Sequence, residues 1–145
     1  MPLLILAAIA VGLVLPLQTG INAQLRLALG HPLAAALVSF LVGTVVLAAA
    51  VVLLRVPLPL GRAAAQTNWW HWTGGALGAA YIFVAVVLAP RLGAATLIAS
   101  IVAGQMLASL LLDQFGWVGF APHPISAARL VGALLVIAGV VLIRR

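Results

Sequence analysis

Five apolar stretches, each long enough to cross a lipid bilayer as a helix, dominate this sequence. A bilayer core takes roughly 20 helical residues, and charged side chains lie almost only near the ends of the stretches. Hydrophobic residues make up 66% of the 145 residues, which is more than a soluble core of this size could bury. We therefore expect an all-α, polytopic membrane protein, a single transmembrane domain with five helices at about 3–29, 33–54, 70–89, 94–113 and 126–143.

The fourth stretch carries the most informative polar residues. Gln105, Ser109 and Asp113 follow one another at intervals of four, so they share one face of an otherwise apolar helix. An unpaired amide in hydrocarbon is costly, and we therefore expect Gln105 to face other helices or a wet cavity. Asp113 is the only acidic residue in the chain.

Polar residues also interrupt the first and third stretches. In the first, Pro16 removes one helical hydrogen bond and is expected to kink the helix just before Gln18 and Asn22. These two residues either line a substrate path or belong to a helix face that extends out of the hydrocarbon core into the lipid headgroups. The hydroxyl of Tyr81 needs a hydrogen-bond partner within the membrane. It either forms a structural hydrogen bond or makes a contact in a cavity. The functional interpretation is a substrate-binding cavity lined by Gln18, Asn22, Tyr81, Gln105 and Ser109.

Glycines and tryptophans mark expected packing surfaces and a membrane boundary. Small residues one or two turns apart let neighbouring helices approach closely, and we assign this packing role to Gly43, Gly74, Gly78, Gly132 and Gly139. Trp69, Trp70 and Trp72 precede the third span together, which is typical of the headgroup level.

The arginines give almost no bias in orientation. With five spans, three arginines fall on the side of the N-terminus and four on the other: Arg55, Arg62 and Arg129 against Arg26, Arg91, Arg144 and Arg145. Near-equality predicts that copies insert both ways and form an antiparallel homodimer. A protein with one weakly biased orientation remains the alternative.

Several classes of function are not expected. The chain has no Cys and no Glu, so a nucleophile–base pair or paired carboxylates are lacking, and we predict no enzyme. His31, His71 and His123 are not spaced as metal ligands, and neither a metal nor a cofactor is expected. The arginines are scattered singly, which argues against nucleic acid as a partner and favours membrane lipid.

Taken together, the sequence resembles a known family, the YdcZ-type branch of the drug/metabolite transporter (DMT) superfamily. The most specific part is the run from Gly104 and Gln105 to the LLLDQFG segment. The resemblance is carried by Gln18, Asn22 and Leu25; Ser39, Phe40 and Gly43; Trp72, Gly74, Gly75 and Gly78; Pro90, Leu92 and Gly93; Gly104, Gln105, Leu112, Asp113, Phe115 and Gly116; and Arg129 and Gly132.

This resemblance implies a multi-pass protein of the bacterial inner (plasma) membrane, half of a ten-helix inverted-repeat transporter. Family members occur as homodimers, paired subunits or fused tandem copies. The last span also looks like the dimer-forming final helix of small multidrug resistance proteins. That group acts through a membrane-embedded Glu, which is absent here, so its proton-coupled mechanism does not transfer.

The leading hypothesis is alternating access by an antiparallel homodimer that moves a small neutral, zwitterionic or amphipathic solute. In this hypothesis Asp113 pairs with Arg129 at the membrane edge and acts as a gate; the alternative for this pair is a static ion pair or a solvated helix end. The alternatives for the whole protein are a dual-topology ion channel and a non-transporting membrane assembly subunit.

Overall fold

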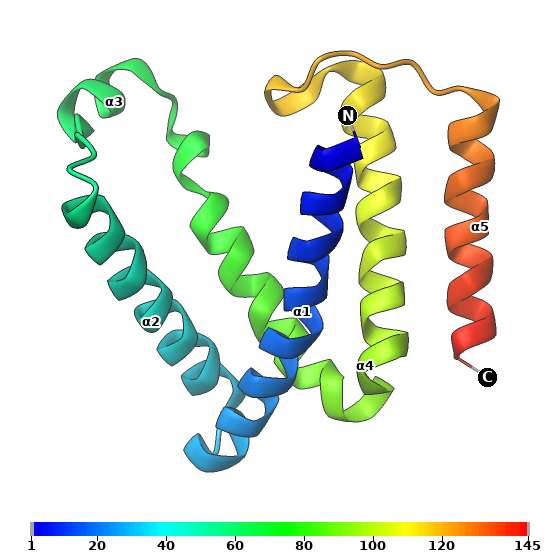
Figure 1. Ribbon diagram of the computed structural model, residues 1–145, viewed down its shortest axis with the longest axis horizontal. Helices are drawn as coiled ribbons and strands as arrows, with labels where there is room; N and C mark the ends of the chain where they lie inside the picture. The colour runs from blue at the N-terminus through cyan, green and yellow to red at the C-terminus, as the bar shows by residue number, and fades with distance from the viewer. Residues whose placement is uncertain (1, 145) are drawn as a thin grey trace. The chain divides into compact units, whose positions relative to one another are not determined.

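The computed structural model describes residues 2–144, and within this range it contains helices and connecting loops but no strand (Figure 1). The chain divides into two compact units. Unit 1 ends at Pro90 and unit 2 begins at Arg91. We describe each unit by itself.

Unit 1 begins with two antiparallel helices, α1 (Pro2–Leu29) and α2 (Pro32–Leu53), which pack against each other (Figure 1). Gly30 adopts a φ of 75° in the turn between them. His31 then caps α2, because its Nδ1 accepts a hydrogen bond from the backbone N–H of Leu33 at 3.2 Å. Pro32 at the start of the helix has no N–H that needs a partner there.

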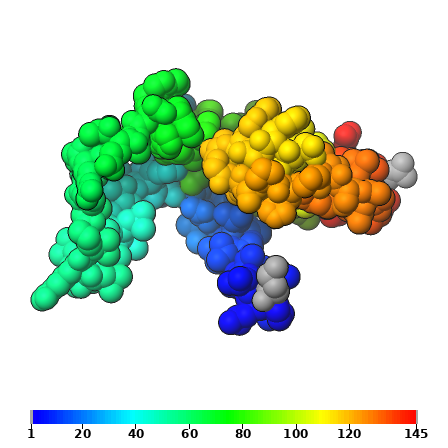
Figure 2. All heavy atoms as spheres, turned by 90° about the horizontal axis from the view of Figure 1, so that it is seen from above, coloured from blue at the N-terminus to red at the C-terminus, as the bar shows by residue number. Residues whose placement is uncertain are grey.

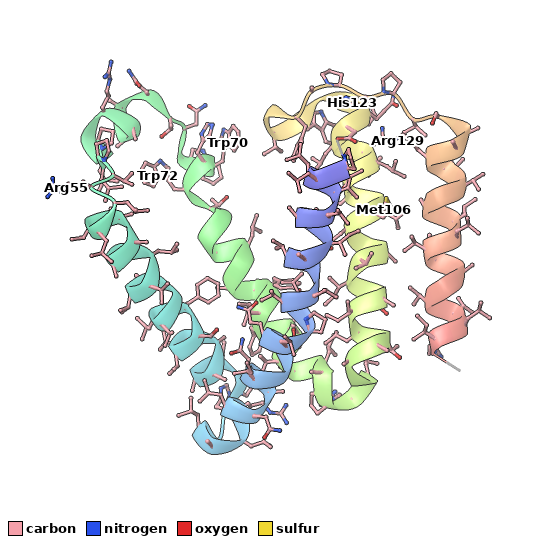
Figure 3. All side chains as sticks on the ribbon, viewed as in Figure 1. Arg55, Trp70, Trp72, Met106, His123 and Arg129 are labelled. Atoms are coloured by element: carbon pink, nitrogen blue, oxygen red, sulfur yellow. The ribbon has the colours of Figure 1, made fainter. Side chains whose placement is uncertain are left out.

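The connection after α2 contains two short helices, α3 (Leu60–Gln66) and the 3-10 helix η1 (Trp69–Trp72). The third span was predicted to begin near residue 70, whereas the α-helix begins only at Gly74. The indole N–H of Trp72 donates to the Thr67 hydroxyl at 3.1 Å, and the ring of Trp70 stacks on His71 (Figure 3). The three tryptophans of η1 remain exposed, as residues at a membrane boundary do.

One long helical segment, α4 (Gly74–Phe115), supplies two crossings of the membrane. Its 42 residues would extend about 63 Å, roughly twice the thickness of a bilayer core. Gly93 interrupts it with φ 73° and ψ 161°, which leaves a first arm (74–92) and a second arm (94–115) of suitable length for one crossing each. Pro90 and Arg91, which lie between the predicted third and fourth spans, are still helical.

Unit 2 consists of the second arm of α4, a loop with the 3-10 helix η2 (Trp117–Gly119), and α5 (Ala127–Ile143). The second arm and α5 run in opposite directions, and the loop covers one end of the unit (Figures 1 and 2). Gly116 ends the second arm in the left-handed region, at φ 63°. Ser126 caps the N-terminus of α5, since its hydroxyl accepts from the N–H of Arg129 at 3.3 Å.

The buried apolar residues are few and mostly small: Ala35, Ala36, Ala85, Val86, Leu97, Leu110 and Ala133. Most leucines, isoleucines and valines are exposed, which suits helices solvated by lipid. α1, α2 and the segment of α4 are long and apolar enough to cross a membrane, and α5 is a shorter apolar helix of 17 residues. The fold class predicted from the sequence, an all-α polytopic membrane protein, is confirmed.

Candidate functional site

Unit 1 contains a small polar cavity between α1, α2 and the first arm of α4. Its volume is about 200 Å³, and no charged side chain lines it. The hydroxyl of Thr44 is already satisfied by the Phe40 carbonyl at 2.8 Å. The Gln18 amide is therefore the strongest hydrogen-bonding group that this cavity offers. The lining residues are Gln18, Ser39, Phe40, Gly43, Thr44, Leu47 and Ile82.

The polar face of α1 turns inward at this depth. Asn22, one turn after Gln18, is only 4% exposed, and Thr19 beside it is 9% exposed. The Thr19 hydroxyl donates to the carbonyl of Leu15 at 2.9 Å, so its polar atom is satisfied within the helix. Asn22 therefore lies on a covered part of α1, whereas Gln18 is partly exposed.

Tyr81, on the first arm of α4, has a hydroxyl that is buried but has no hydrogen-bond partner among residues 2–144. An unpaired buried hydroxyl costs free energy, and such groups are rare in folded proteins. The structural hydrogen bond that was one alternative for Tyr81 is not formed by the described part of this chain. The hydroxyl oxygen itself is shielded within the described chain, and Tyr81 is not among the residues that line the cavity of Gln18.

A second cavity of unit 1, of about 320 Å³, is entirely apolar. Phe40 lines this cavity as well as the polar one, and its ring lies 3.4 Å from the position that a Cβ on Gly78 would occupy. A methyl group at Gly78 would therefore make an ordinary van der Waals contact with this ring. The residues of this apolar cavity are Leu33, Ala36, Leu37, Phe40, Ala79, Ala80 and Phe83.

The other glycines assigned to packing have no such neighbour. A Cβ at any of them would meet nothing within 4 Å in the described chain; these are Gly43, Gly74, Gly132 and Gly139. Gly43 instead lines the polar cavity of unit 1. Of the five packing assignments, the chain itself supplies a close contact only for Gly78.

The remaining substrate-binding candidates, Gln105 and Ser109, lie on the second arm of α4 in unit 2. Both side chains are exposed, and neither lines the pocket of about 500 Å³ that unit 2 contains. The five candidates therefore differ in exposure: Asn22 is buried, Gln18 and Tyr81 are partly exposed, and Gln105 and Ser109 are exposed on unit 2.

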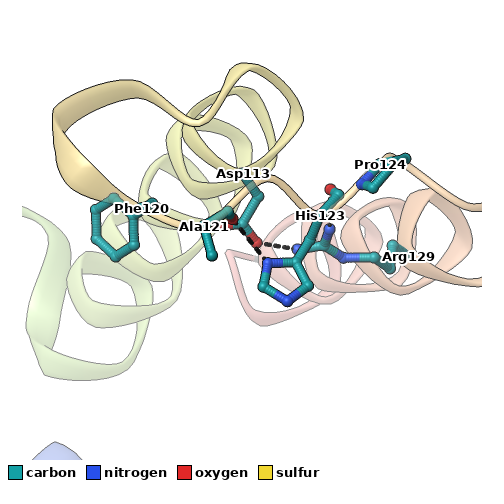
Figure 4. Close-up of a pocket in the computed structure, with 6 residues that line it drawn as sticks. All are labelled: Asp113, Phe120, Ala121, His123, Pro124 and Arg129. Carbon is teal, nitrogen blue, oxygen red and sulfur yellow. Dashed lines mark hydrogen bonds and ion pairs between the residues drawn. The ribbon is translucent and has the colours of Figure 1, made fainter.

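Asp113 and Arg129 form an ion pair at the end of unit 2 that carries the loop (Figures 3 and 4). Arg129 donates from Nη2 to the Asp113 carboxylate and from Nη1 to the carbonyl of His123 at 2.8 Å. The N–H of His123 in turn donates to the Asp113 carbonyl at 2.7 Å. The two charged side chains are 23% and 33% exposed, so the pair is partly shielded from water.

Sequence reasoning missed two members of this cluster. It treated His123 as a loop residue, and it gave Gln114 no role. In the structure the side-chain oxygen of Gln114 accepts from the N–H of Ile125 at 2.7 Å, and His123 bridges the charged pair through its backbone. These contacts join residues six to eleven positions apart in a loop, where no helical or strand period could signal them.

A pocket of about 500 Å³ opens beside the ion pair (Figure 4). The loop supplies an aromatic and an imidazole ring to its wall, while the ends of α4 and α5 supply the two charges. The lining residues are Asp113, Phe120, Ala121, His123, Pro124 and Arg129.

Apolar crossings, uncharged polar groups at depth and an ion pair at a helix end define a small, multi-pass membrane protein of the transport class. The family described as "Putative inner membrane exporter, YdcZ" matches residues 3–142, and the chain belongs to this family. It is similar to "Inner membrane protein YdcZ" of Escherichia coli (strain K12), with 29% identity over 137 residues that cover 94% of this chain and 91% of that protein. No solved structure matches the chain.

The comparisons confirm the family that the sequence resembles. They also show that it is a multi-pass protein of the bacterial inner membrane, and they support membrane transport as its general function.

Proposed function

We propose that this protein is one half of a transporter, in which two oppositely inserted copies form a ten-helix unit that moves a small solute by alternating access. Five crossings per copy and the division of the arginines, three against four, support this arrangement. Two opposed identical copies would reproduce the inverted repeats from which many secondary transporters are built. The family is described as a putative inner membrane exporter, which supports a function in transport.

The polar interior of unit 1 carries the proposal. Asn22 is buried, Gln18 lines a cavity, and the Tyr81 hydroxyl is buried without a partner in the described chain. Amides and a phenol provide donors and acceptors without net charge, and no charged residue lines either cavity of this unit. Such a site suits a neutral, zwitterionic or amphipathic solute and leaves a strongly cationic one without a counter-charge.

Gln105 and Ser109 extend this site in the proposed dimer. Their side chains are exposed on unit 2, in a span where an uncovered amide is costly. A second copy or the transported solute would cover them. The Asp113–Arg129 pair would then act as a gate at the membrane edge, one at each face of an antiparallel dimer.

Membrane topology provides the decisive test, because the chain contains no Cys. We would place single cysteines by Pro2→Cys and, separately, Arg145→Cys, and treat intact cells with a membrane-impermeant thiol reagent. Opposed insertion predicts that each variant is labelled in a subpopulation, with the remainder labelled only after lysis. Gly61→Cys, in the connection after α2, serves as the control and is expected to follow position 2. Labelling of one terminus alone would contradict the antiparallel homodimer.

The Tyr81→Phe variant tests whether the hydroxyl serves the solute and not the fold. Because the hydroxyl is buried without a partner, its removal is expected to raise the unfolding free energy by about 1 kcal/mol while lowering transport. The readouts are thermal unfolding in detergent and solute flux into proteoliposomes. Tyr81→Leu, which also removes the ring, should be destabilising. A marked loss of stability in Tyr81→Phe would instead reveal a structural hydrogen bond.

A further inference from the structure

The pocket beside the Asp113–Arg129 pair lies at the level of the lipid headgroups. The second arm of α4 ends at Phe115, and the loop that follows exposes Trp117, Val118 and Phe120. The rings of Phe115 and Trp117 stack with centroids 4.8 Å apart. Exposed aromatic residues directly after a membrane crossing are typical of the interface between hydrocarbon and water. The mouth of the pocket therefore meets the polar region of the bilayer.

Arg129 retains hydrogen-bond donors on the pocket side of the ion pair. A guanidinium carries five N–H groups, and two of them are engaged, by the Asp113 carboxylate and the His123 carbonyl. The other three have no partner among residues 2–144, and the side chain lines the pocket. Free guanidinium N–H groups in a fixed geometry are well suited to phosphate oxygens.

Asp113 and His123 add unpaired acceptors to the same wall. One carboxylate oxygen of Asp113 binds Arg129, which leaves the other without a partner in the described chain. The Nδ1 of His123 lies 2.8 Å from the carbonyl of Ala121. Because a carbonyl only accepts, Nδ1 carries the hydrogen, and in the neutral ring Nε2 remains as an acceptor. Two acceptors beside a pocket suit an ammonium group that has N–H donors.

The pair as a whole has no net charge, and this limits the ligand. An anion without a positive group would face the Asp113 carboxylate, and a cation without a negative group would face Arg129. A ligand with one charge of each sign satisfies both. We propose that this pocket binds an ammonium–phosphate zwitterion, with the phosphate on Arg129 and the ammonium on Asp113 and His123. The residues of this site belong to unit 2, whereas the solute cavity is lined by residues of unit 1, and lipid binding can be measured without transport.

A competition between three lipids tests the proposal on the full-length protein. The protein is purified in mild detergent, mixed with equal amounts of phosphatidylethanolamine, phosphatidylcholine and phosphatidylglycerol, and analysed by native mass spectrometry. We expect phosphatidylethanolamine to be retained about tenfold over phosphatidylcholine, whose methylated ammonium has no N–H to donate. A similar excess over phosphatidylglycerol, which lacks the ammonium, is expected. Equal retention of the three lipids would overturn the proposal.

The double variant Asp113→Asn/Arg129→Gln removes both charges but keeps groups that can hydrogen-bond to each other. It is expected to lose the preference for phosphatidylethanolamine, whereas Arg91→Gln, which removes an arginine outside the pocket, should keep it. A second variant does not disturb the ion pair: His123→Phe should reduce the discrimination against phosphatidylcholine and leave retention of phosphatidylglycerol unchanged. An unchanged preference in both pocket variants would contradict the assignment.

The same chemistry could come from a membrane lipid or from a soluble molecule, and soluble phosphoethanolamine separates the two. If millimolar phosphoethanolamine displaces the retained lipid, the pocket recognises the free zwitterion. If it does not, while the lipid preference persists, the ligand is the lipid in its bilayer. Retention of neither the lipid nor phosphoethanolamine would refute the site.

Discussion

The Gly93→Ala variant is expected to lose about 1–3 kcal/mol of unfolding free energy, because it forces a side chain into a backbone conformation that only glycine tolerates. At Gly93 φ is 73° and ψ is 161°. A Cβ built there would meet nothing within 4 Å, so the cost is one of backbone strain and not of a clash. The variant can escape the strain by continuing the helix, which would remove the break between the two membrane crossings of α4. Circular dichroism during thermal unfolding in detergent measures the loss.

Gly104→Ala is the matched control for this variant. Gly104 lies within the second arm of the same helical segment, has an ordinary helical backbone, and also has open space around its Cα. Alanine there should stabilise the helix by about 0.5–1 kcal/mol, since glycine loses more backbone entropy on folding. The two substitutions are chemically identical and have opposite expected signs. Equal effects would show that Gly93 is not strained.

The break at Gly93 also illustrates what the sequence could specify. The number and positions of the crossings follow from the lengths of the apolar stretches, and these are local properties. The cap at Ser126 is local too, because its hydroxyl binds an N–H only three residues away. The exact point of the break within α4 was not accessible in this way, because Gly93 alone, and not Pro90 or Arg91, leaves the helical conformation.

The candidate site was less accessible to sequence reasoning. Spacing placed Gln18 and Asn22 on one face, but only the neighbouring helices show that Asn22 is covered. The spacing also identified glycine-containing helix faces, but it did not show which helices pack against them. Gly78 meets Phe40 within the chain, while Gly132 and Gly139 on α5 meet nothing in the described residues. Lipid is as apolar as leucine, so hydrophobicity does not select the helices that associate in a membrane. Small residues permit close packing there, but they do not identify the partner helix.

Removing either member of the Asp113–Arg129 pair is expected to lower the unfolding free energy by about 1–3 kcal/mol, the range for hydrogen bonds to charged groups, reduced toward the lower end by partial exposure. Arg129→Gln should cost more than Asp113→Asn, because Arg129 also holds the His123 carbonyl. The double variant should cost less than the sum, and less than Arg129→Gln alone, since Asp113→Asn then removes a carboxylate that the loss of Arg129 left unpaired. Chemical unfolding of the four proteins in detergent gives the coupling energy, and Asp113→Asn/Arg91→Gln, which should be additive, provides the control.

Stability alone cannot distinguish a static ion pair from a gate, but stability and transport measured together can. A static pair predicts that transport falls only as far as the amount of folded protein falls, so that the double variant transports better than Arg129→Gln alone. A gate must open in each transport cycle, and its contribution to transport depends on the two charges and not on the stability of the folded protein. A gate therefore predicts that Asp113→Asn abolishes transport at normal expression and that the more stable double variant does not recover it. Unaltered transport in Asp113→Asn would show that the pair has only a structural role, in which it joins the ends of α4 and α5.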